Sequence, residues 1–566
     1  MSSSARALRS LRSLLPSRAD YSGLGASWRV DVLAGITVGI VALPLALAFG
    51  VSSGVGAEAG LVTAIIAGFV AAVFGGSNVQ VSGPTGAMVV VLAPIVAHHG
   101  PGAVATVALM AGLMVLLSGV LRLGRALSYL PWPVIEGFTA GIGIIIFLQQ
   151  VPSALGVQIS GHSTNAVVAA LQVLREAAWP QALLPLGAVI LVAALMLVLG
   201  RWLPALPGSF VAILAVSLLA ALLQLPLATI GELPNSLPAP ALPALDPALL
   251  AALAGPAAAV AALAAIESLL SARVAASLSN TGSLNADREL VGQGLASIAA
   301  GLFGGMPATG AIARTAVNVR SGARSRLASI VHAVLLLVVV VAAAGIVSRI
   351  PLAALAGVLM VTAARMVSIS TFRRVARSGR SSALVFIVTA LVTVVFDLVI
   401  AVGIGIAVAA FFALRTLSRS SGAHREPLPG PAEPGDSRIA LFRIDGSLFF
   451  GAAEPLLDEI AAAGEDRPGA PLETADPGIQ VVVLRLSQLQ IVDATGANAL
   501  GELVTALERR GVTVLIKGVR PEHRPLLEQL GVIGALRHPN HLFAELEPAI
   551  AHARDHVRRA AAAPGA

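Results

Sequence analysis

Residues Gly83–Met88 read GPTGAM, and Pro307–Ile312 repeat the pattern as PATGAI. Each copy lies in a short apolar segment, at Thr85–Ala97 or at Thr309–Val319, that follows a stretch containing Gly and Pro. Both segments are shorter than the roughly 20 residues that a helix needs to cross a bilayer, so we predict two half-helices. Such interrupted segments at matching positions of two halves are typical of a transporter's substrate site, although they also occur as plain kinks in packed helices.

The composition places most of the chain in lipid. The 566 residues are 56% hydrophobic and only 12% charged, a balance that soluble domains rarely show. The apolar runs have the length of bilayer-crossing helices rather than of barrel strands. We therefore predict an all-α polytopic membrane protein.

Fourteen apolar segments can be drawn, seven in each half of the chain. Because the number per half is odd, the second copy has the opposite orientation, which makes a 7+7 inverted repeat. The last two segments form one unbroken run, which we divide near Asp397 because Ser381–Leu414 is too long for one crossing. The segments lie at Val30–Gly50, Ala57–Phe74, Thr85–Ala97, Gly102–Leu121, Pro133–Val151, Gln181–Leu199 and Gly208–Leu225, and then at Leu249–Val274, Glu289–Phe303, Thr309–Val319, Leu327–Val347, Leu352–Met366, Ala383–Phe396 and Leu398–Leu414.

Arginines set the predicted orientation. With a cytoplasmic N-terminus, the even-numbered segments end inside, and arginines follow these segments, for example Arg122 and Arg125. Arg175 and Arg349 deviate from this pattern. We predict a cytoplasmic tail at residues 1–29, a transport domain at 30–419 in a bacterial inner or plasma membrane, and both termini in the cytoplasm.

Two charged residues lie within the apolar segments. Arg314 follows Thr309 by about one turn, where hydrocarbon makes a guanidinium costly by about 2.5–3.5 kcal/mol, so we expect it to face the site. The alternative is that it snorkels to the cytoplasmic surface beside Arg320. Glu267 lies in the middle of its crossing, and Ser271 follows one turn later. We predict that Glu267 accepts a coupling proton or binds sodium with Ser271, and the alternative is a structural pair with Arg314.

Several functions are excluded. The chain has no Cys, which rules out disulfides, thiolate metal sites and Cys nucleophiles. Many of the basic residues behind the net charge of +7 lie at the ends of apolar runs, which a membrane surface explains without nucleic acid. No Ser/His/Asp set, metal cluster or phosphate loop is visible, so we expect no enzyme and no cofactor or metal apart from the possible sodium ion.

The composition changes after Arg419. Residues 420–437 are polar and rich in Pro and Gly, as in a linker, and residues 438–553 alternate strand-like and helical patterns. We predict an α/β domain here and a disordered tail at 554–566. Strands are expected at Ile439–Ile444, Ser447–Phe450, Ile479–Leu486 and Thr513–Lys517, and helices near Ala453–Ala463, Thr495–Arg509 and Pro521–Leu530.

Over nearly its whole length the chain resembles the SulP anion permeases, the family of animal sulfate, chloride/bicarbonate and prestin-type proteins. The motifs are ALPLALAF at Ala42–Phe49, GPTG at Gly83–Gly86, IESLLS at Ile266–Ser271, ELVGQG at Glu289–Gly294 and FGGMPATGAIART at Phe303–Thr315. The resemblance implies a core and a gate domain, an elevator-like motion, a homodimer and a C-terminal STAS domain. Position by position, it implies an anion site lined by Phe49, Thr85, Gly86, Thr309, Gly310, Ala311, Ala313 and Arg314.

The resemblance favours two anions nearly equally. Residues 41–60 are similar to the bicarbonate-transporting branch, which is sodium-coupled and has Asp at the position of Glu267. Arg314, in contrast, is typical of sulfate- and dicarboxylate-type members. Many relatives have Gln where this chain has Leu45, and the loss of that polar contact favours dehydrated or singly charged anions. We expect a secondary active transporter of bicarbonate or sulfate, coupled to sodium or protons, with a C4-dicarboxylate or chloride-exchanging carrier as the alternative.

The sequence DATG at Asp493–Gly496 is similar to the STAS loop that carries a phosphorylated Ser or Thr in anti-sigma-factor antagonists. Thr495 is the matching hydroxyl and our candidate regulatory site, and a helix N-cap at Asp493 or Thr495 is the alternative. A regulatory protein or nucleotide is the expected partner of this domain. A membrane-anchored signalling protein would be a different functional class, but the charges at Glu267 and Arg314 argue against a bundle that only senses.

Overall fold

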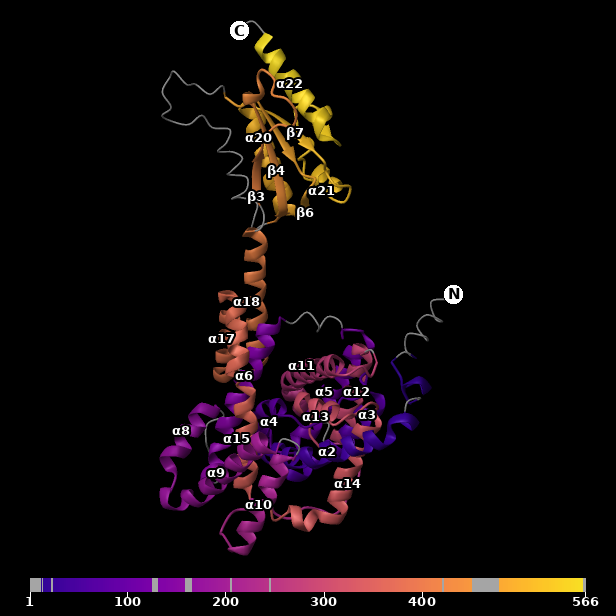
Figure 1. Ribbon diagram of the computed structural model, residues 1–566, viewed down its shortest axis with the longest axis vertical. Coiled ribbons are helices and arrows are strands. Elements are labelled where there is room, and N and C mark those ends of the chain that lie inside the picture. Colours follow the sequence, from indigo (N-terminus) through magenta and orange to yellow (C-terminus); the bar gives the residue numbers. More distant parts are fainter. Residues whose placement is uncertain are drawn as a thin grey trace. The chain divides into compact units, whose positions relative to one another are not determined.

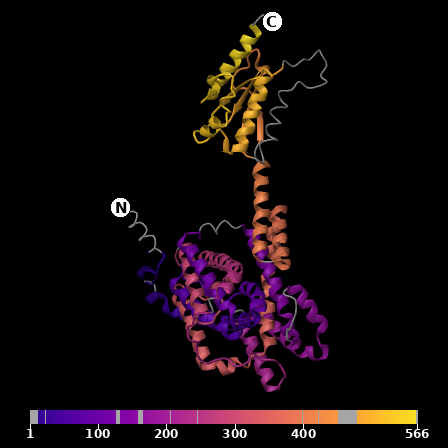
Figure 2. The ribbon, with the colours of Figure 1, turned by 180° about the vertical axis from the view of Figure 1, so that it is seen from behind.

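The computed structural model describes residues 12, 14–21, 24–124, 131–157, 165–203, 206–243, 246–282, 284–396, 398–419, 422–449 and 478–562. The chain divides into two compact units, Met1–Ala407 and Val408–Ala566, and the division falls inside helix α18, Leu398–Arg419. The first unit is a helical bundle, and the second contains a β-sheet covered by helices (Figures 1 and 2).

Within the described residues, helices occur at all fourteen predicted positions. The division of the last apolar run is confirmed, since α17 ends at Val395 and α18 begins at Leu398. In the described part of the chain, eight helices are long and apolar enough to cross a bilayer by length and composition. The fourteen are α2 (Leu24–Ser52), α3 (Ala57–Phe74), α4 (Gly86–His99), α5 (Ala103–Val120), α6 (Trp132–Gln149), α9 (Trp179–Trp202), α10 (Gly208–Leu222), α11 (Pro247–Leu278), α12 (Ala286–Leu302), α13 (Ile312–Arg320), α14 (Leu327–Val347), α15 (Leu352–Met366), α17 (Arg380–Val395) and α18.

Among the described residues of the first unit, three short α-helices were not predicted: α7 (Val151–Leu155), α8 (Ala166–Glu176) and α16 (Ile369–Ser378). These helices are too short to cross a bilayer, and α16 contains several arginines. They were not predicted because the prediction relied on long apolar runs.

The helices of the first unit form two groups. One group packs α2, α3, α5, α11, α12 and α14 around the short helices α4 and α13. The other group contains α6, α9, α10, α15 and α17. Figure 1 shows α3, α5, α12 and α13 together, with α8, α9 and α15 in the other part of this unit. This division corresponds to the core and gate domains that the resemblance implies.

Two buried carboxylates hold the loops beside the half-helices. Glu289 of α12 accepts hydrogen bonds from the backbone N–H groups of residues 76–77, at 2.7 and 3.1 Å, shortly before α4. Asp31 of α2 accepts from the N–H groups of residues 324–325, also at 2.7 and 3.1 Å, shortly after α13. Backbone donors away from water must find partners within the protein, so these carboxylates stabilise irregular backbone at the ends of the half-helices.

The second unit is built on a six-stranded sheet with strand order β3-β4-β5-β7-β8, in which β6 also pairs with β4. β3 is antiparallel to β4, and the other pairs are parallel. Alternate strand residues pack against α20 on one face and against α22 on the other. The elements are β3 (Gly422–Glu426), β4 (Ile439–Leu448), β5 (Val481–Arg485), β6 (Leu489–Val492), α20 (Ala494–Arg509), β7 (Thr513–Lys517), α21 (Arg524–Gln529), β8 (Leu542–Phe543) and α22 (Leu546–Ala562).

Several boundaries predicted for this domain differ from the structure. The strands predicted at Ile439–Ile444 and Ser447–Phe450 form a single strand, β4, over Ile439–Leu448. β3 lies inside the predicted linker, because its backbone pairs with β4 although its side chains are largely polar. The predicted disordered tail begins at residue 554, but α22 continues to Ala562 because Ala553 and Val557, one turn apart, are buried against the sheet. The helix predicted near Ala453–Ala463 lies outside the described residues.

Helices α2 and α3 approach each other closely at Gly60. A Cβ atom at Gly60 would collide with the carbonyl oxygen of Ala46 and lie 3.0 Å from Gly50 N. The substitution Gly60→Ala should therefore lower the melting temperature of the detergent-purified protein, because overpacking costs about 1–3 kcal/mol.

The matched control is Gly255→Ala in α11, where an added Cβ has no heavy atom within 4 Å. This variant should melt at or above the wild-type temperature, since Ala has the higher helix propensity. If Gly60→Ala melts with the wild type, the close crossing of α2 and α3 is wrong.

Candidate functional site

The two half-helices begin on either side of a short antiparallel bridge. Its strands are β1 (Ser82–Gly83) and β2 (Thr309–Gly310). Helix α4 starts at Gly86, shortly after β1, and α13 starts at Ile312, shortly after β2. The bridge therefore brings the N-terminal ends of both half-helices to one place, although more than 200 residues separate them in the sequence.

The predicted start of the second half-helix is wrong by three residues. Thr309 and Gly310 are in the bridge rather than in the helix, because their backbone pairs with β1. Ala311 continues this pairing by donating its N–H to Val81 O at 2.8 Å, and it is the N-cap residue of α13.

Both helix N-termini lack a side-chain cap. The N-cap residues are Thr85 for α4 and Ala311 for α13, and neither side chain accepts a hydrogen bond from its helix. Neither first turn contains an acidic residue. The first N–H groups of a helix have no intrahelical partner and carry a partial positive charge, so the two ends together create a site suited to an anion.

Glu267 of α11 connects the two repeats. Its Oε2 accepts hydrogen bonds from the hydroxyls of Thr85 and Thr309, each at 2.8 Å. The two hydroxyl oxygens are 3.3 Å apart. Three oxygen atoms, one from each of three chain segments, are thus clustered beside the helix ends.

The serines next to Glu267 hold α11 against the second repeat. Ser268 Oγ accepts a hydrogen bond from Gly310 N at 3.0 Å. Ser271 Oγ lies 3.0 Å from Thr315 Oγ1, which itself accepts from the N–H of Val81 at 3.0 Å. Ser271 is therefore engaged with Thr315, one turn away from the oxygen cluster at Glu267.

Arg314 is the third residue of α13 and is only 2% exposed. Its Nη2 donates to Pro84 O, and its Nη1 has no hydrogen-bond partner among the described residues. A positive charge in the first turn of a helix is disfavoured by the helix dipole, so Arg314 does not stabilise α13. Arg314 adds a full positive charge to the two partial charges of the helix ends.

A cavity of about 1020 Å³ reaches this part of the site. Its lining includes Leu45, Ala313 and Arg314, together with the exposed Arg320. A second cavity of about 730 Å³ is lined by the C-terminal part of α4, including His98 and His99. Both cavities are lined by helices of both groups of the bundle.

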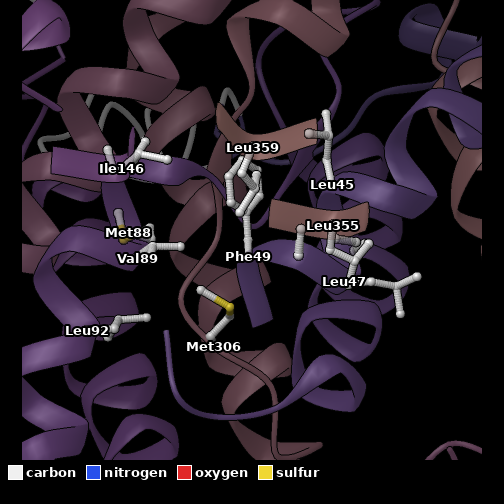
Figure 3. Packing of buried hydrophobic residues seen from close by; sticks show 14 of the residues in the cluster. Leu45, Leu47, Phe49, Met88, Val89, Leu92, Ile146, Met306, Leu355 and Leu359 are labelled. Atoms are coloured by element: carbon white, nitrogen blue, oxygen red, sulfur yellow. The ribbon is translucent and has the colours of Figure 1, made fainter. Parts of the chain in front are cut away.

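Phe49 lies on the apolar side of the site. Figure 3 shows its ring among Ile146, Leu359 and Met306. A Cβ atom at Gly86 would collide with Ile146 and lie 3.4 Å from the Phe49 ring, so the glycine permits close packing at the start of α4. The structure thus places Phe49 beside Gly86 on α4, whereas Ala313 and Arg314 lie on α13.

Sequence reasoning missed Gln80. This residue is buried, and neither its Nε2 nor its Oε1 has a hydrogen-bond partner within the described residues. A Cβ atom at Gly310 would collide with the Gln80 amide, so the two residues are neighbours. The sequence feature that could have indicated Gln80 is its position as a polar residue shortly before the GPTGAM motif. Ser268 and Thr315 were also missed as partners, because their roles depend on which segments meet.

Asp493, rather than Thr495, caps α20. The Asp493 side chain accepts a hydrogen bond from Gly496 N at 2.8 Å. Thr495 is the second residue of the helix, and its side chain is exposed. The alternative that Thr495 serves as the N-cap is therefore wrong.

Two uncapped helix N-termini meet a buried arginine and a carboxylate inside this helical bundle, an arrangement suited to binding an anion. Residues 28–389 match the sulfate permease family, and residues 431–549 match the STAS domain. The chain belongs to the sulfate permease family, and it is a transporter rather than an enzyme.

Relatives match along most of the chain. The putative sulfate transporter YvdB of Bacillus subtilis is 34% identical over 509 residues, covering 89% of this chain and 93% of YvdB. The bicarbonate transporter BicA of Picosynechococcus is 31% identical over 532 residues, covering 89% of this chain and 90% of BicA. The solved structure of the murine anion transporter Slc26a9 has a TM-score of 0.81 at 16% identity, covers 96% of this chain and 94% of its own, and shows the fold alone.

The hydroxyl of Thr309 can be tested directly. Thr309→Val removes one donor to Glu267 and should lower the initial rate of anion uptake into proteoliposomes by about 10-fold or more, because a hydrogen bond to a charged group contributes about 1.5–3 kcal/mol. Thr309→Ser should restore most of the rate. The control is Thr389→Val in α17, since the Thr389 hydroxyl bonds only to Val385 O of its own helix among the described contacts. Wild-type uptake by Thr309→Val would contradict the role of the hydroxyl.

Proposed function

We propose that this chain is a secondary active transporter of a small inorganic anion. Bicarbonate is the better-supported substrate and sulfate is the second candidate, and transport is coupled to sodium or protons. The observation that carries the proposal is the meeting of two uncapped helix N-termini with Arg314 and Glu267. The anion is proposed to bind at the residues predicted to line the site: Phe49, Thr85, Gly86, Thr309, Gly310, Ala311, Ala313 and Arg314.

Different features of the chain support bicarbonate and sulfate. The similarity of residues 41–60 to the bicarbonate branch, the 31% identity to BicA and the apolar Leu45 support bicarbonate. Arg314 and the 34% identity to YvdB support sulfate. Bicarbonate ranks first because Leu45, which lines the cavity beside Arg314, offers no polar contact to a second negative charge.

The charges of the site support coupling to a cation. Ionised Glu267 offsets Arg314, which leaves about one positive charge from the two helix ends. A cation bound at Glu267 raises this charge by one, whether the cation is sodium or a proton, and so strengthens the attraction for an anion. The oxygen cluster of Glu267, Thr85 and Thr309 supplies the hard ligands that sodium prefers, which supports sodium. Ser271 is one turn away and would need to leave Thr315 to join it.

We include in the proposal an elevator-type motion of the core helices against the gate helices. Leu45 and Phe49 of α2 face Leu355 and Leu359 of α15 where the two groups meet (Figure 3). Apolar contacts of this kind have no directional hydrogen bonds to break, which supports sliding between the two groups.

The remaining parts of the proposal concern location and regulation. We propose that both termini lie in the cytoplasm and that the bundle spans the bacterial inner membrane. The arginines that follow the even-numbered segments support this orientation. The transporter is proposed to act as a homodimer, with a regulatory protein or nucleotide binding its STAS domain. Thr495 is the proposed phosphorylation site, and its place in the first turn of α20 supports this role, because a phosphate group is favourable at a helix N-terminus.

Arg314→Ala tests the anion site. Uptake should fall by about 10- to 100-fold, since a hydrogen bond to a charged group contributes about 1.5–3 kcal/mol. The measurement is the initial rate of uptake of labelled bicarbonate and sulfate into proteoliposomes, with the melting temperature as a check on folding. Arg349→Ala, at an exposed loop position, is the matched control and should transport normally. Normal uptake by a folded Arg314→Ala protein would remove Arg314 from the anion site.

Glu267→Gln tests the coupling. Glutamine retains a carbonyl oxygen for the hydroxyls of Thr85 and Thr309 but has no charge, so anion exchange should persist while accumulation driven by a sodium or proton gradient should be lost. The measurement compares uptake under an imposed sodium gradient, an imposed pH gradient and no gradient. If the variant still accumulates anion against its gradient with unchanged sodium and pH dependence, Glu267 has only a structural role.

A further inference from the structure

Three histidines converge in the STAS domain at a place that the transport function does not use. His541 lies just before the edge strand β8, and His552 and His556 lie one turn apart on α22. The ring centroids are 5.4 Å apart for His541 and each of the other two, and 4.9 Å apart for His552 and His556. One potential ligand atom from each ring lies within 4.8 Å of the others.

The ring nitrogens of this cluster are not fully committed to other bonds. His541 Nδ1 and His552 Nε2 are buried and have no hydrogen-bond partner among the described residues. Burial, together with the neighbouring imidazoles, lowers the pKa of His541 to about 4, and burial also lowers the pKa of His556. The neutral imidazole is the form that binds a metal ion, and the lowered pKa favours this form in His541 and His556.

The charges around the three histidines are of both signs. Arg537 and Arg559 are the nearby cations. Arg537 is paired with Glu508 at 3.1 Å, and the carboxylate of Asp555 lies near His556 and favours positive charge there. His538, with its ring centroid 6.1 Å from that of His541, offers one more imidazole at the edge of the cluster.

We infer that His541, His552 and His556 bind a divalent transition-metal ion of the zinc type. Imidazole nitrogens suit zinc, and three protein ligands leave a fourth position for water or for His538. In a tetrahedral site with bonds of about 2.0–2.1 Å, neighbouring nitrogens lie about 3.3 Å apart, so small side-chain rotations bring the three rings into place. The sequence signal was the i, i+4 spacing of His552 and His556, together with the fact that four of the ten histidines follow residue 537.

A metal ion here would join two elements that otherwise meet through a few apolar side chains. β8 has only two residues and lies at the edge of the sheet. α22 packs on the sheet through Ala549, Ala553 and Val557. Coordination by His541 from one side and by the two α22 histidines from the other would fasten the C-terminal helix to the edge strand and stabilise the STAS domain when the ion is present.

The test uses the full-length protein in detergent after treatment with a chelator. Zn²⁺ is titrated by calorimetry, and hydrogen exchange of α22 is followed with and without Zn²⁺. We expect one Zn²⁺ per chain and slower exchange in residues 546–562. The double variant His552→Gln/His556→Gln should lose about 100-fold or more in affinity, since even partners outside the ligand shell contribute 10- to 100-fold.

Two further variants serve as controls. His424→Gln, at an exposed position of β3, should bind Zn²⁺ as the wild type does. The single variant His556→Gln should weaken binding while leaving the melting temperature without metal unchanged, which separates loss of a ligand from loss of the fold. The inference is overturned if the wild type does not bind Zn²⁺, or if the folded single and double variants bind it with wild-type affinity.

Discussion

The short bridge between β1 and β2 is the constraint on which the membrane unit depends. It places the N-terminal ends of α4 and α13 side by side within a bundle of apolar helices. The first backbone N–H groups of a helix have no partner within the helix, so they need partners elsewhere. The hydroxyls of Thr85 and Thr309 donate to Glu267, and neither helix has a hydrogen bond from its first turn to the side chain of its N-cap residue. The positive ends of both helices are therefore not capped by the side chain of an N-cap residue.

The rest of the core stabilises this arrangement. Glu289 and Asp31 each bind two backbone N–H groups in the loops beside the half-helices, so the irregular segments have fixed partners although they have no regular secondary structure. Gly86 permits close packing of Ile146 and Phe49 at the start of α4. Arg314, in contrast, destabilises its own helix, because a buried cation in the first turn is repelled by the positive end of the helix dipole. Residues that break a local rule in an otherwise consistent fold are typical of functional sites.

The sequence was sufficient to predict the positions of the fourteen helices and the pairing of the two half-helices, because apolar run length and internal repetition are properties of the chain itself. The sequence was insufficient where backbone pairing between distant segments determines the secondary structure. Thr309 and Gly310 form a strand only because β1 lies opposite, and β3 forms only because β4 does. The unpartnered amide of Gln80 and the convergence of His541 with α22 likewise depend on segments that meet only in the fold.

The contacts of Glu267 explain how one ion could influence a second ligand. Its Oε2 contacts Thr85 of the first repeat and Thr309 of the second, and each threonine lies just before a half-helix. A change in the charge at Glu267 therefore acts on both halves of the proposed anion site at once. Coupling between two bound ligands is reciprocal, so a cation that raises the affinity for the anion is itself bound more tightly when the anion is present. Such mutual stabilisation favours the states with both ligands or with neither, which are the states that a symporter needs to move between the two sides of the membrane.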